Sequence, residues 1–131
     1  MTDYSVSKDH YYMRNALDLS ERGLGNTYPN PSIGVVIVKN DKIISRGWTQ
    51  PGGRPHAESI ALNKNKKIFK GATLYSTFEP CSHFGKTPPC VDQIIKSKIK
   101  RVVIALKDPN PKVNGRGIIK LKKNKIKVTL G

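Results

Sequence analysis

Short apolar runs rich in β-branched residues alternate with segments of helical periodicity along most of this sequence. The clearest run, Ile33-Gly34-Val35-Val36-Ile37-Val38, lies between turn-forming residues and predicts a buried strand. Asn40-Asp41 then predicts a turn, after which residues 42–48 return as a second strand. The two strands are expected to form an antiparallel hairpin, so the fold must contain a β-sheet.

The rest of the chain continues this alternation and predicts an α/β fold. The expected helices span residues 7–21, 56–65, 90–97 and 118–124, and the expected later strands span residues 72–78, 101–106 and 126–130. Strands that alternate with short helices favour parallel pairing, with helices on both faces of the sheet. A chain of 131 residues that is 37% hydrophobic can bury one core. We therefore expect residues 1–131 to form a single domain with three α/β/α layers and a mixed five-stranded sheet.

The chain carries 24 Lys and Arg against 9 Asp and Glu, which gives a net charge of +15. Dense cationic side chains can neutralise the phosphates of a nucleic acid. Lys, Ile and Asn all have AT-rich codons, however, and a compositionally biased genome would enrich the three together. The lysines are also scattered, with few aromatic residues among them for base stacking. Composition is therefore the favoured explanation of the charge, and nucleic acid is not the expected partner.

Nothing in the sequence predicts a membrane-bound or secreted protein. No stretch of about 18 apolar residues occurs, so no spanning helix is expected. The first residues lack a basic region followed by an apolar run, so no secretory signal is expected either. Two cysteines, Cys81 and Cys90, are too few for a disulfide scaffold. We expect a cytoplasmic protein that makes no membrane contact.

Three short motifs carry the residue types suited to metal chemistry. They are Pro55-His56-Ala57-Glu58, Glu79-Pro80-Cys81 and Pro88-Pro89-Cys90. The motifs lie at junctions between strands and helices, and parallel strands bring such junctions to one edge of the sheet. One imidazole and two thiolates suit tetrahedral zinc. We therefore predict that His56, Cys81 and Cys90 bind one catalytic Zn²⁺ per chain.

Glu58 lies two residues beyond the predicted ligand His56, so we expect it beside the metal rather than on it. Three protein ligands leave one position for water, as in catalytic zinc sites, and zinc lowers the pKa of that water to about 7. A carboxylate at Glu58 could take the water's proton and pass it on. One alternative is a closed structural site with His83 as fourth ligand, in a non-enzymatic binding module. Another is that both cysteines are simply buried apolar residues.

These motifs resemble the zinc nucleobase deaminases, in which His-x-Glu is followed by Pro-Cys and a second Cys. Eight residues separate Cys81 from Cys90, and this long spacing is similar to the deaminase domain of the riboflavin biosynthesis protein, a member of the cytidine-deaminase-like superfamily. Further segments share the resemblance, namely residues 30–34, 47–48, 53–58, 79–83 and 108–111 with Gly115 and Gly117. Deaminases acting on cytidine or tRNA adenosine carry two residues between the cysteines. The spacing therefore argues against the alternative of a polynucleotide deaminase acting on tRNA or single-stranded DNA, which would need a basic track leading to the zinc.

The resemblance implies a hydrolytic deamination early in riboflavin synthesis. The substrate would be 2,5-diamino-6-(5-phosphoribosylamino)pyrimidin-4(3H)-one, which loses ammonia to give 5-amino-6-(5-phosphoribosylamino)uracil. Glu58 would protonate a ring nitrogen and then the departing amine. Residues carried over as substrate contacts are Asn30, His83, Lys86, Asp108 and Asn110. Thr49 stands where the family commonly has a histidine that touches substrate, so we expect that contact to be weakened or replaced.

The resemblance also carries expectations about partners. Many relatives continue into a reductase domain that uses NADPH. We expect no reductase domain and no NADP site within residues 1–131, so the reduction step would belong to a separate polypeptide. Relatives form oligomers, and a homo-oligomer is therefore expected here.

Overall fold

The computed structural model describes residues 4–25, 32–51, 56–62, 66–81, 90–106 and 115–130. Within these ranges, helices and strands alternate as the sequence predicts. The elements in chain order are helix α1 (Tyr4–Glu21), strands β1 (Gly34–Lys39) and β2 (Lys42–Trp48), helix α2 (Ala57–Ala61), the 3₁₀ helix η2 (Lys66–Phe69), strand β3 (Thr73–Ser76), helix α3 (Cys90–Lys96), strand β4 (Arg101–Ile104), helix α4 (Arg116–Lys123) and strand β5 (Lys127–Leu130).

The five strands form one mixed sheet in the order β2-β1-β3-β4-β5, which confirms the expected sheet. Strand β1 pairs antiparallel with both β2 and β3, whereas β3, β4 and β5 run parallel to one another. The expected hairpin turn lies at Asn40 and Asp41, which both adopt positive φ values of 52° and 62°, as a type I′ turn requires. Because β3, β4 and β5 are parallel, the segments that follow them begin at the same edge of the sheet.

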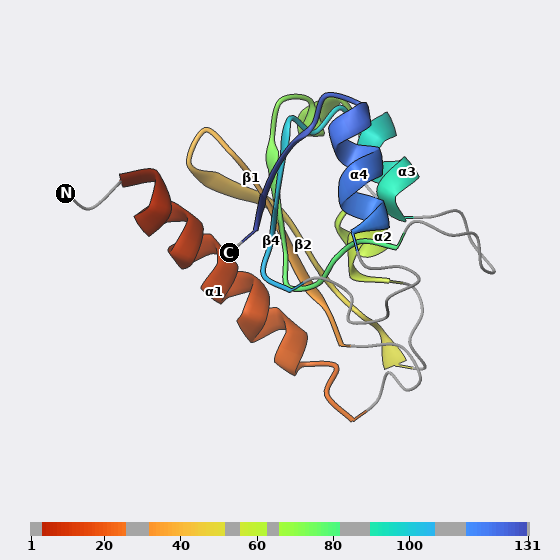
Figure 1. Cartoon of the computed structure of the whole chain (residues 1–131). Helices are drawn as coiled ribbons and strands as arrows, with labels where there is room; N and C mark the ends of the chain where they lie inside the picture. The colour runs from red at the N-terminus through yellow and green to blue at the C-terminus, as the bar shows by residue number, and fades with distance from the viewer. Residues whose placement is uncertain are drawn as a thin grey trace.

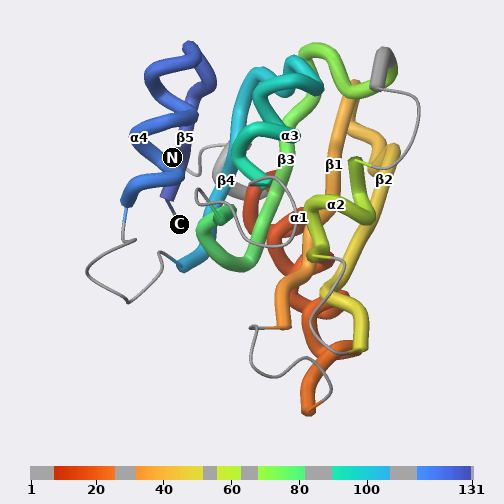
Figure 2. Tube along the Cα trace, turned by 90° about the vertical axis from the view of Figure 1, so that its right-hand side faces the viewer, coloured from red at the N-terminus to blue at the C-terminus, as the bar shows by residue number. Residues whose placement is uncertain are grey.

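Alternate residues of the strands build two separate cores, one on each face of the sheet. The larger core includes Val35, Leu74 and Val102 with buried side chains of α2, α3 and α4, and the smaller one packs Val36 and Tyr75 against α1. Figure 1 shows α1 on one side of the sheet and the other helices on the opposite side, and the turned view of Figure 2 agrees. The three-layer α/β/α arrangement is therefore confirmed.

Helix α2 lies unusually close to β2 because Gly47 has no side chain. A Cβ atom at Gly47 would lie 2.3 Å from the carbonyl oxygen of Ala57 and 2.8 Å from the amide nitrogen of Ala61. Both alanines are fully buried. The glycine in β2 therefore determines how near the sheet this short helix lies, and α2 carries Glu58 and directly follows His56.

The observed boundaries depart from the expected ones at several helices. The first helix begins at Tyr4, before the predicted start at Ser7, and α4 begins at Arg116, two residues before the predicted Ile118. Helix α2 ends at Ala61, and residues 63–65 of the longer predicted helix lie outside the described residues. The 3₁₀ helix η2 was not predicted, because a single short turn carries no periodicity that distinguishes it from a loop. Helix ends depend on weak local preferences, whereas the elements themselves follow the apolar pattern.

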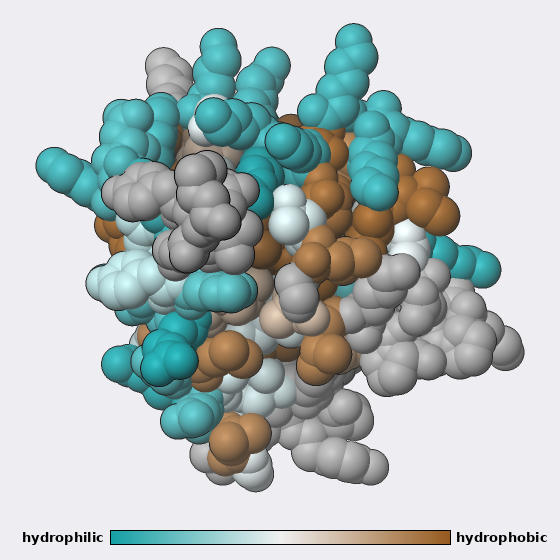
Figure 3. All heavy atoms as spheres, turned by 60° about the vertical axis from the view of Figure 1, so that its left-hand side comes forward, coloured by the Kyte–Doolittle hydropathy of each residue, from teal (hydrophilic) through white to brown (hydrophobic). Residues whose placement is uncertain are grey.

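Many of the lysines lie at one end of the sheet, where the parallel strands begin. Lys98 and Lys100 precede β4, Lys125 precedes β5, and Lys127 begins β5; all four side chains are exposed. Helix α3 ends at this same end with the exposed Lys96. Figure 3 shows long hydrophilic side chains along this upper edge of the molecule. Among the described residues, no helix is long and apolar enough to cross a membrane.

Candidate active site

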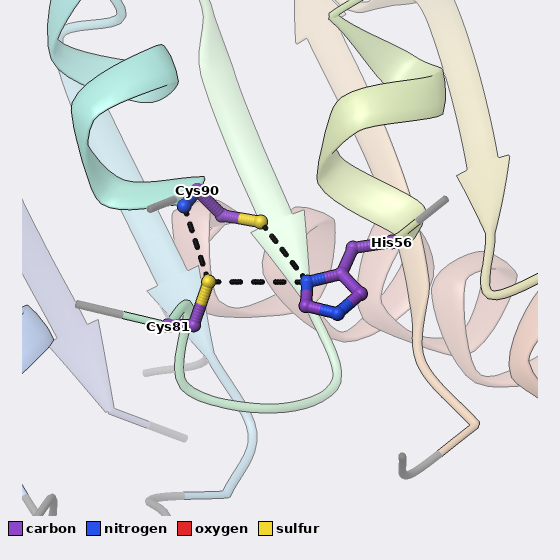
Figure 4. A group of neighbouring side chains, drawn as sticks. All are labelled: His56, Cys81 and Cys90. Atoms are coloured by element: carbon purple, nitrogen blue, oxygen red, sulfur yellow. Dashed lines mark hydrogen bonds between the residues drawn. The ribbon is translucent and has the colours of Figure 1, made fainter. Parts of the chain in front are cut away.

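The three predicted metal ligands lie together at the edge of the sheet where the parallel strands end. His56 is the N-cap residue of α2, Cys81 follows β3, and Cys90 is the first residue of α3. His56 Nδ1 lies 3.8 Å from Cys81 Sγ and 3.4 Å from Cys90 Sγ. All three candidate ligand atoms lie within 4.8 Å of one another, and Figure 4 shows the three side chains pointing toward a common centre. The sheet topology therefore joins residues that are up to 34 positions apart in the sequence.

Backbone hydrogen bonds hold the two cysteines in register with each other. The amide of Cys90 donates to Cys81 Sγ over 3.1 Å, and the amide of Val91 donates to the Cys81 carbonyl oxygen over 3.1 Å. These amides belong to the first turn of α3, where they have no partner within the helix. Cys81 therefore accepts the first two backbone hydrogen bonds that α3 cannot form within itself. These bonds hold the sulfur of Cys81 beside Cys90.

This donor set fits zinc. An imidazole nitrogen and two sulfurs are the ligands that zinc accepts in tetrahedral geometry, and the two cysteines are free thiols. Within the described residues, no fourth His, Cys, Asp or Glu side chain joins the cluster. His83, the candidate fourth ligand of a closed structural site, lies outside the described residues. The described residues thus supply three ligands for a metal ion.

The two thiols shift each other's pKa in opposite directions. A hydrogen bond from Cys90 lowers the pKa of Cys81 to about 4, and the same hydrogen bond, together with burial, raises the pKa of Cys90. Both sulfurs must lose their protons to bind a metal ion, so binding should release a proton from Cys90. The metal affinity of the cluster will therefore increase with pH.

Glu58 lies beside the cluster with its carboxyl group removed from water. The residue is only 1% exposed, and its Oε1 atom has no hydrogen-bond partner among the described residues. Burial raises the pKa of Glu58 to about 7, although a hydrogen bond from Cys90 and the charge of His56 act in the opposite direction. A buried oxygen without a partner is costly unless another group occupies the site. The Oε1 atom of Glu58 is therefore open to a group that the described residues do not supply.

Two residues that support the cluster were missed by the sequence reasoning. Contact with Cys81 and burial raise the pKa of the Cys90 thiol, and the neighbouring Ser59 hydroxyl opposes that rise in small part. The side-chain amide of Gln93 donates to Ser59 Oγ over 3.1 Å and so holds that hydroxyl in place. Partners that orient a metal ligand tune the site. Their positions in the sequence could have indicated this role, because Ser59 directly follows Glu58 and Gln93 lies one helical turn beyond Cys90.

The predicted substrate contacts are mostly outside the described part of the chain. This holds for Asn30, His83, Lys86, Asp108 and Asn110, whose roles stay predictions. Thr49 is described, and it is 1% exposed. Its Oγ1 accepts a hydrogen bond from the Ile33 amide over 2.9 Å. The threonine hydroxyl therefore joins the end of β2 to the start of β1, and a substrate contact there stays a prediction.

Comparison with known proteins places this fold and site in one class. Residues 6–106 match the family described as the cytidine and deoxycytidylate deaminase zinc-binding region. The match covers more than half of the chain, and the chain belongs to this family. The resemblance seen in the sequence is thereby confirmed.

Particular relatives narrow the class further. The chain is 52% identical over 124 residues to the diaminohydroxyphosphoribosylamino-pyrimidine deaminase of Buchnera aphidicola subsp. Schizaphis graminum, covering 95% of this chain and 84% of that protein. It is 51% identical over 123 residues to riboflavin biosynthesis protein RibD of Aquifex aeolicus, covering 94% of this chain and 35% of the relative. The solved structure of Acinetobacter baumannii RibD, form 1, superposes with a TM-score of 0.92 at 46% identity, covering 95% of this chain and 35% of that one. The chain thus spans about a third of the RibD proteins and most of the Buchnera deaminase.

Proposed function

We propose that this protein is the zinc-dependent hydrolase that deaminates 2,5-diamino-6-(5-phosphoribosylamino)pyrimidin-4(3H)-one in riboflavin biosynthesis. The observation that carries the proposal is the buried carboxyl group of Glu58, whose unpaired Oε1 lies beside one imidazole and two thiols. A structural zinc site has no use for such a group. The names of the relatives, about half identical to this chain, support the substrate.

His56, Cys81 and Cys90 would hold the zinc ion through Nδ1 or Nε2 and the two sulfurs. When bound, zinc would supply a water molecule acidic enough to react at neutral pH. Glu58 would take a proton from that water and deliver it to a ring nitrogen. It would then take the second proton from the hydroxyl group added at the ring carbon and pass it to the departing amine. The reaction adds water, forms a carbon–oxygen bond at the ring carbon that bears the 2-amino group, and breaks the carbon–nitrogen bond to release ammonia.

The raised pKa of Glu58 suits these two proton transfers. A group with a pKa of about 7 can accept a proton and return it near neutral pH without a large free-energy cost in either direction. The same burial that raises the pKa excludes bulk water, so the proton is not lost between the two steps. Glu58 therefore acts as both base and acid in one catalytic cycle.

The test is to incubate the zinc-loaded protein with the diaminopyrimidine ribose phosphate and to measure the release of ammonia. We expect ammonia from this substrate and none from tRNA or single-stranded DNA. Glu58→Gln should lose turnover and keep its zinc, whereas Glu21→Gln, at an exposed glutamate that ends α1, should behave as the wild type. Ammonia from tRNA alone would support the polynucleotide deaminase, and full activity of Glu58→Gln would contradict the proton transfers.

The distribution of charge favours a small-molecule substrate over a polynucleotide. Cys90 begins α3 at the metal cluster, and the exposed Lys96 ends the same helix away from it. Lys98, Lys100 and Lys125 lie at that distant end as well. The lysines of these described elements therefore form no basic track toward the cluster, which a polynucleotide deaminase would need.

We also propose three features of the protein's context. Residues 1–131 would act as one deaminase domain in the cytoplasm, where the free thiols stay reduced. A separate polypeptide would carry out the following reduction; the Buchnera relative, 84% of which this chain covers, is named for the deaminase alone. The chain would form a homo-oligomer through apolar surface such as Leu106 and Leu130, which are 64% and 49% exposed. Light scattering would measure the oligomer, and NADPH consumption in the presence of the deaminated product would expose any reductase activity of this chain.

A further inference from the structure

Glu79 is a buried acidic residue in the segment 79–81, which follows β3, ends at Cys81 and is here called the cysteine segment. It joins this segment to the beginning of α4. It is 5% exposed. Its Oε1 accepts a hydrogen bond from the Gly115 amide and its Oε2 accepts one from the Gly117 amide, each over 3.0 Å. Both oxygens of one carboxylate are therefore directed at the backbone of a segment that lies 36 to 38 positions further along the chain.

Helix α4 lacks a cap from its own sequence, and Glu79 supplies one. The N-cap residue of α4 is Gly115, with a φ of 79° and no side chain to accept a hydrogen bond, and the first turn contains no acidic residue. The free amides at a helix start favour an acceptor with negative charge. The carboxylate of Glu79 accepts hydrogen bonds from these amides although it lies outside the helix. The start of α4 is therefore hydrogen-bonded to the cysteine segment.

The contact is tight on both sides of the cysteine segment. The amide of Glu79 donates to the Leu106 carbonyl oxygen over 2.8 Å, which ties the segment to the chain just after β4. A Cβ atom at Gly117 would lie 2.6 Å from the carbonyl oxygen of Pro80, so the first turn of α4 packs directly on the residue before Cys81. The backbone leading to this cysteine therefore has little freedom to move.

We propose that Glu79 is a positioning residue for the metal site, which holds Cys81 at ligand distance by capping α4. The inference rests on the ligand set of the proposed function but not on its substrate. Glu79 lies two residues before Cys81 in the sequence, whereas Cys90 lies nine residues after it. The hydrogen bonds at Cys90 and Val91 fix Cys81 from α3, and Glu79 fixes it from α4. Loss of this second anchor should loosen the sulfur of Cys81 even though no ligand atom is removed.

The experiment compares the metal site of Glu79→Gln with that of the wild type. Zinc release from the full-length protein is followed with a chromogenic chelator, and the cobalt-substituted protein is examined for its sulfur-to-cobalt charge-transfer absorption. Neither measurement uses the pyrimidine substrate, so failure of the proposed reaction would leave them intact. If the wild-type protein bound no zinc, the proposed function itself would be contradicted. A wild-type protein that binds zinc but releases no ammonia would contradict only the proposed substrate.

We expect zinc release from Glu79→Gln to be about 10- to 100-fold faster, with weaker charge-transfer absorption. The glutamine side chain has the same size, but one oxygen is replaced by an NH₂ group that faces a backbone donor. The matched control is Asp9→Asn, which removes a partly buried carboxylate that accepts hydrogen bonds on the other face of the sheet. It should lower stability while leaving zinc release and the cobalt spectrum unchanged.

A second variant tests the same contact from the other side. Gly117→Ala places a methyl group against the Pro80 carbonyl oxygen and should also accelerate zinc release. This variant, together with the shorter side chain of Glu79→Asp, decides the matter if Glu79→Gln does not fold. Zinc release at the wild-type rate in the folded variants, with an unchanged cobalt spectrum, would overturn the proposal. Equal acceleration in Asp9→Asn would also overturn it, because the effect would then reflect general loss of stability.

Discussion

Two carboxyl groups on opposite faces of the same sheet have opposite environments. Asp9, on α1, accepts two hydrogen bonds from Arg101, over 3.0 and 2.6 Å, and one from the Tyr75 hydroxyl over 2.6 Å. Glu58, on α2, is more deeply buried, and its Oε1 has no partner among the described residues. Arg101 also donates hydrogen bonds to Thr129 Oγ1 on β5. The hydrogen-bond network around Asp9 is therefore made by side chains of the protein itself.

The difference separates a carboxylate with a lowered pKa from one with a raised pKa. Burial acts to raise the pKa of both groups. At Asp9 the hydrogen bonds from Arg101 and Tyr75 outweigh burial and hold the pKa below its usual value of 3.8. At Glu58 burial outweighs the opposing contacts, and the pKa is raised to about 7. A carboxylate with both oxygens hydrogen-bonded stabilises the protein, whereas one with an oxygen left without a partner and a pKa near neutrality can exchange protons.

The largest expected effect is on catalysis by Glu58→Gln. Loss of the proton carrier should reduce turnover by about 10²- to 10⁴-fold. Zinc content should stay at one per chain, because the ligands are untouched. Ammonia release and metal analysis on the same preparation measure both quantities. A variant that lost its zinc as well would indicate that Glu58 holds the metal site together rather than reacting at it.

The next effect concerns the pH dependence of stability in the metal-free protein. The folded-state pKa of Glu58 is raised from 4.5 to about 7, so the folded protein binds a proton more tightly than the unfolded chain. The contribution is fully present below pH 4.5 and is lost as pH rises through 7. Relative to Glu58→Gln, the wild type should lose about 3 kcal/mol of unfolding free energy over this interval. Urea unfolding of both proteins from pH 4 to 8 provides the measurement, and a parallel pair of curves would contradict it.

Asp9→Asn should show the opposite pH dependence and a somewhat smaller effect. The folded-state pKa of Asp9 is lowered, so its contribution is present above the unfolded pKa and is lost as pH falls through the folded one. At pH 7 the variant should lose about 2 kcal/mol of unfolding free energy, the usual scale for a hydrogen-bonded charged group. The difference should shrink below pH 4. Asp18→Asn, at an exposed site of the same helix, is the control, and deaminase activity should be unaffected by either change.

The smallest expected effect is that of Ser59→Ala on zinc affinity. Removing the hydroxyl that hydrogen-bonds to Cys90 should weaken zinc binding about tenfold, or about 1.4 kcal/mol. Competition with a chelator of known affinity measures the change. Ser97→Ala removes a hydroxyl bonded to the Gln93 carbonyl oxygen, away from the sulfurs, and should leave the affinity unaltered. Equal affinities for the two variants would show that Ser59 does not tune the thiol.

The sequence predicted the elements and the candidate ligands because both depend on local patterns. β-Branched runs and helical spacing locate the strands and helices, and the metal-binding residue types lie at their junctions. The ion pair of Asp9 with Arg101 joins residues 92 positions apart, and the Glu79 hydrogen bonds span 36 and 38 positions. No local periodicity encodes such pairs. Glu79 belonged to a recognised motif, yet only α4 explains what its carboxylate does.

By itself, the sequence determined the order of strands and helices, the mixed sheet, and the identity of the residues that can bind zinc, because apolar spacing and side-chain chemistry are properties of short segments. Only the tertiary structure decided which carboxylate has both oxygens hydrogen-bonded and which keeps one oxygen without a partner among the described residues. Asp9 and Glu58 are both acidic residues on helices. They differ in the hydrogen-bond donors that distant parts of the chain place beside each carboxyl group. Arg101 and Tyr75 reach Asp9, whereas no side chain of the described residues reaches Glu58 Oε1.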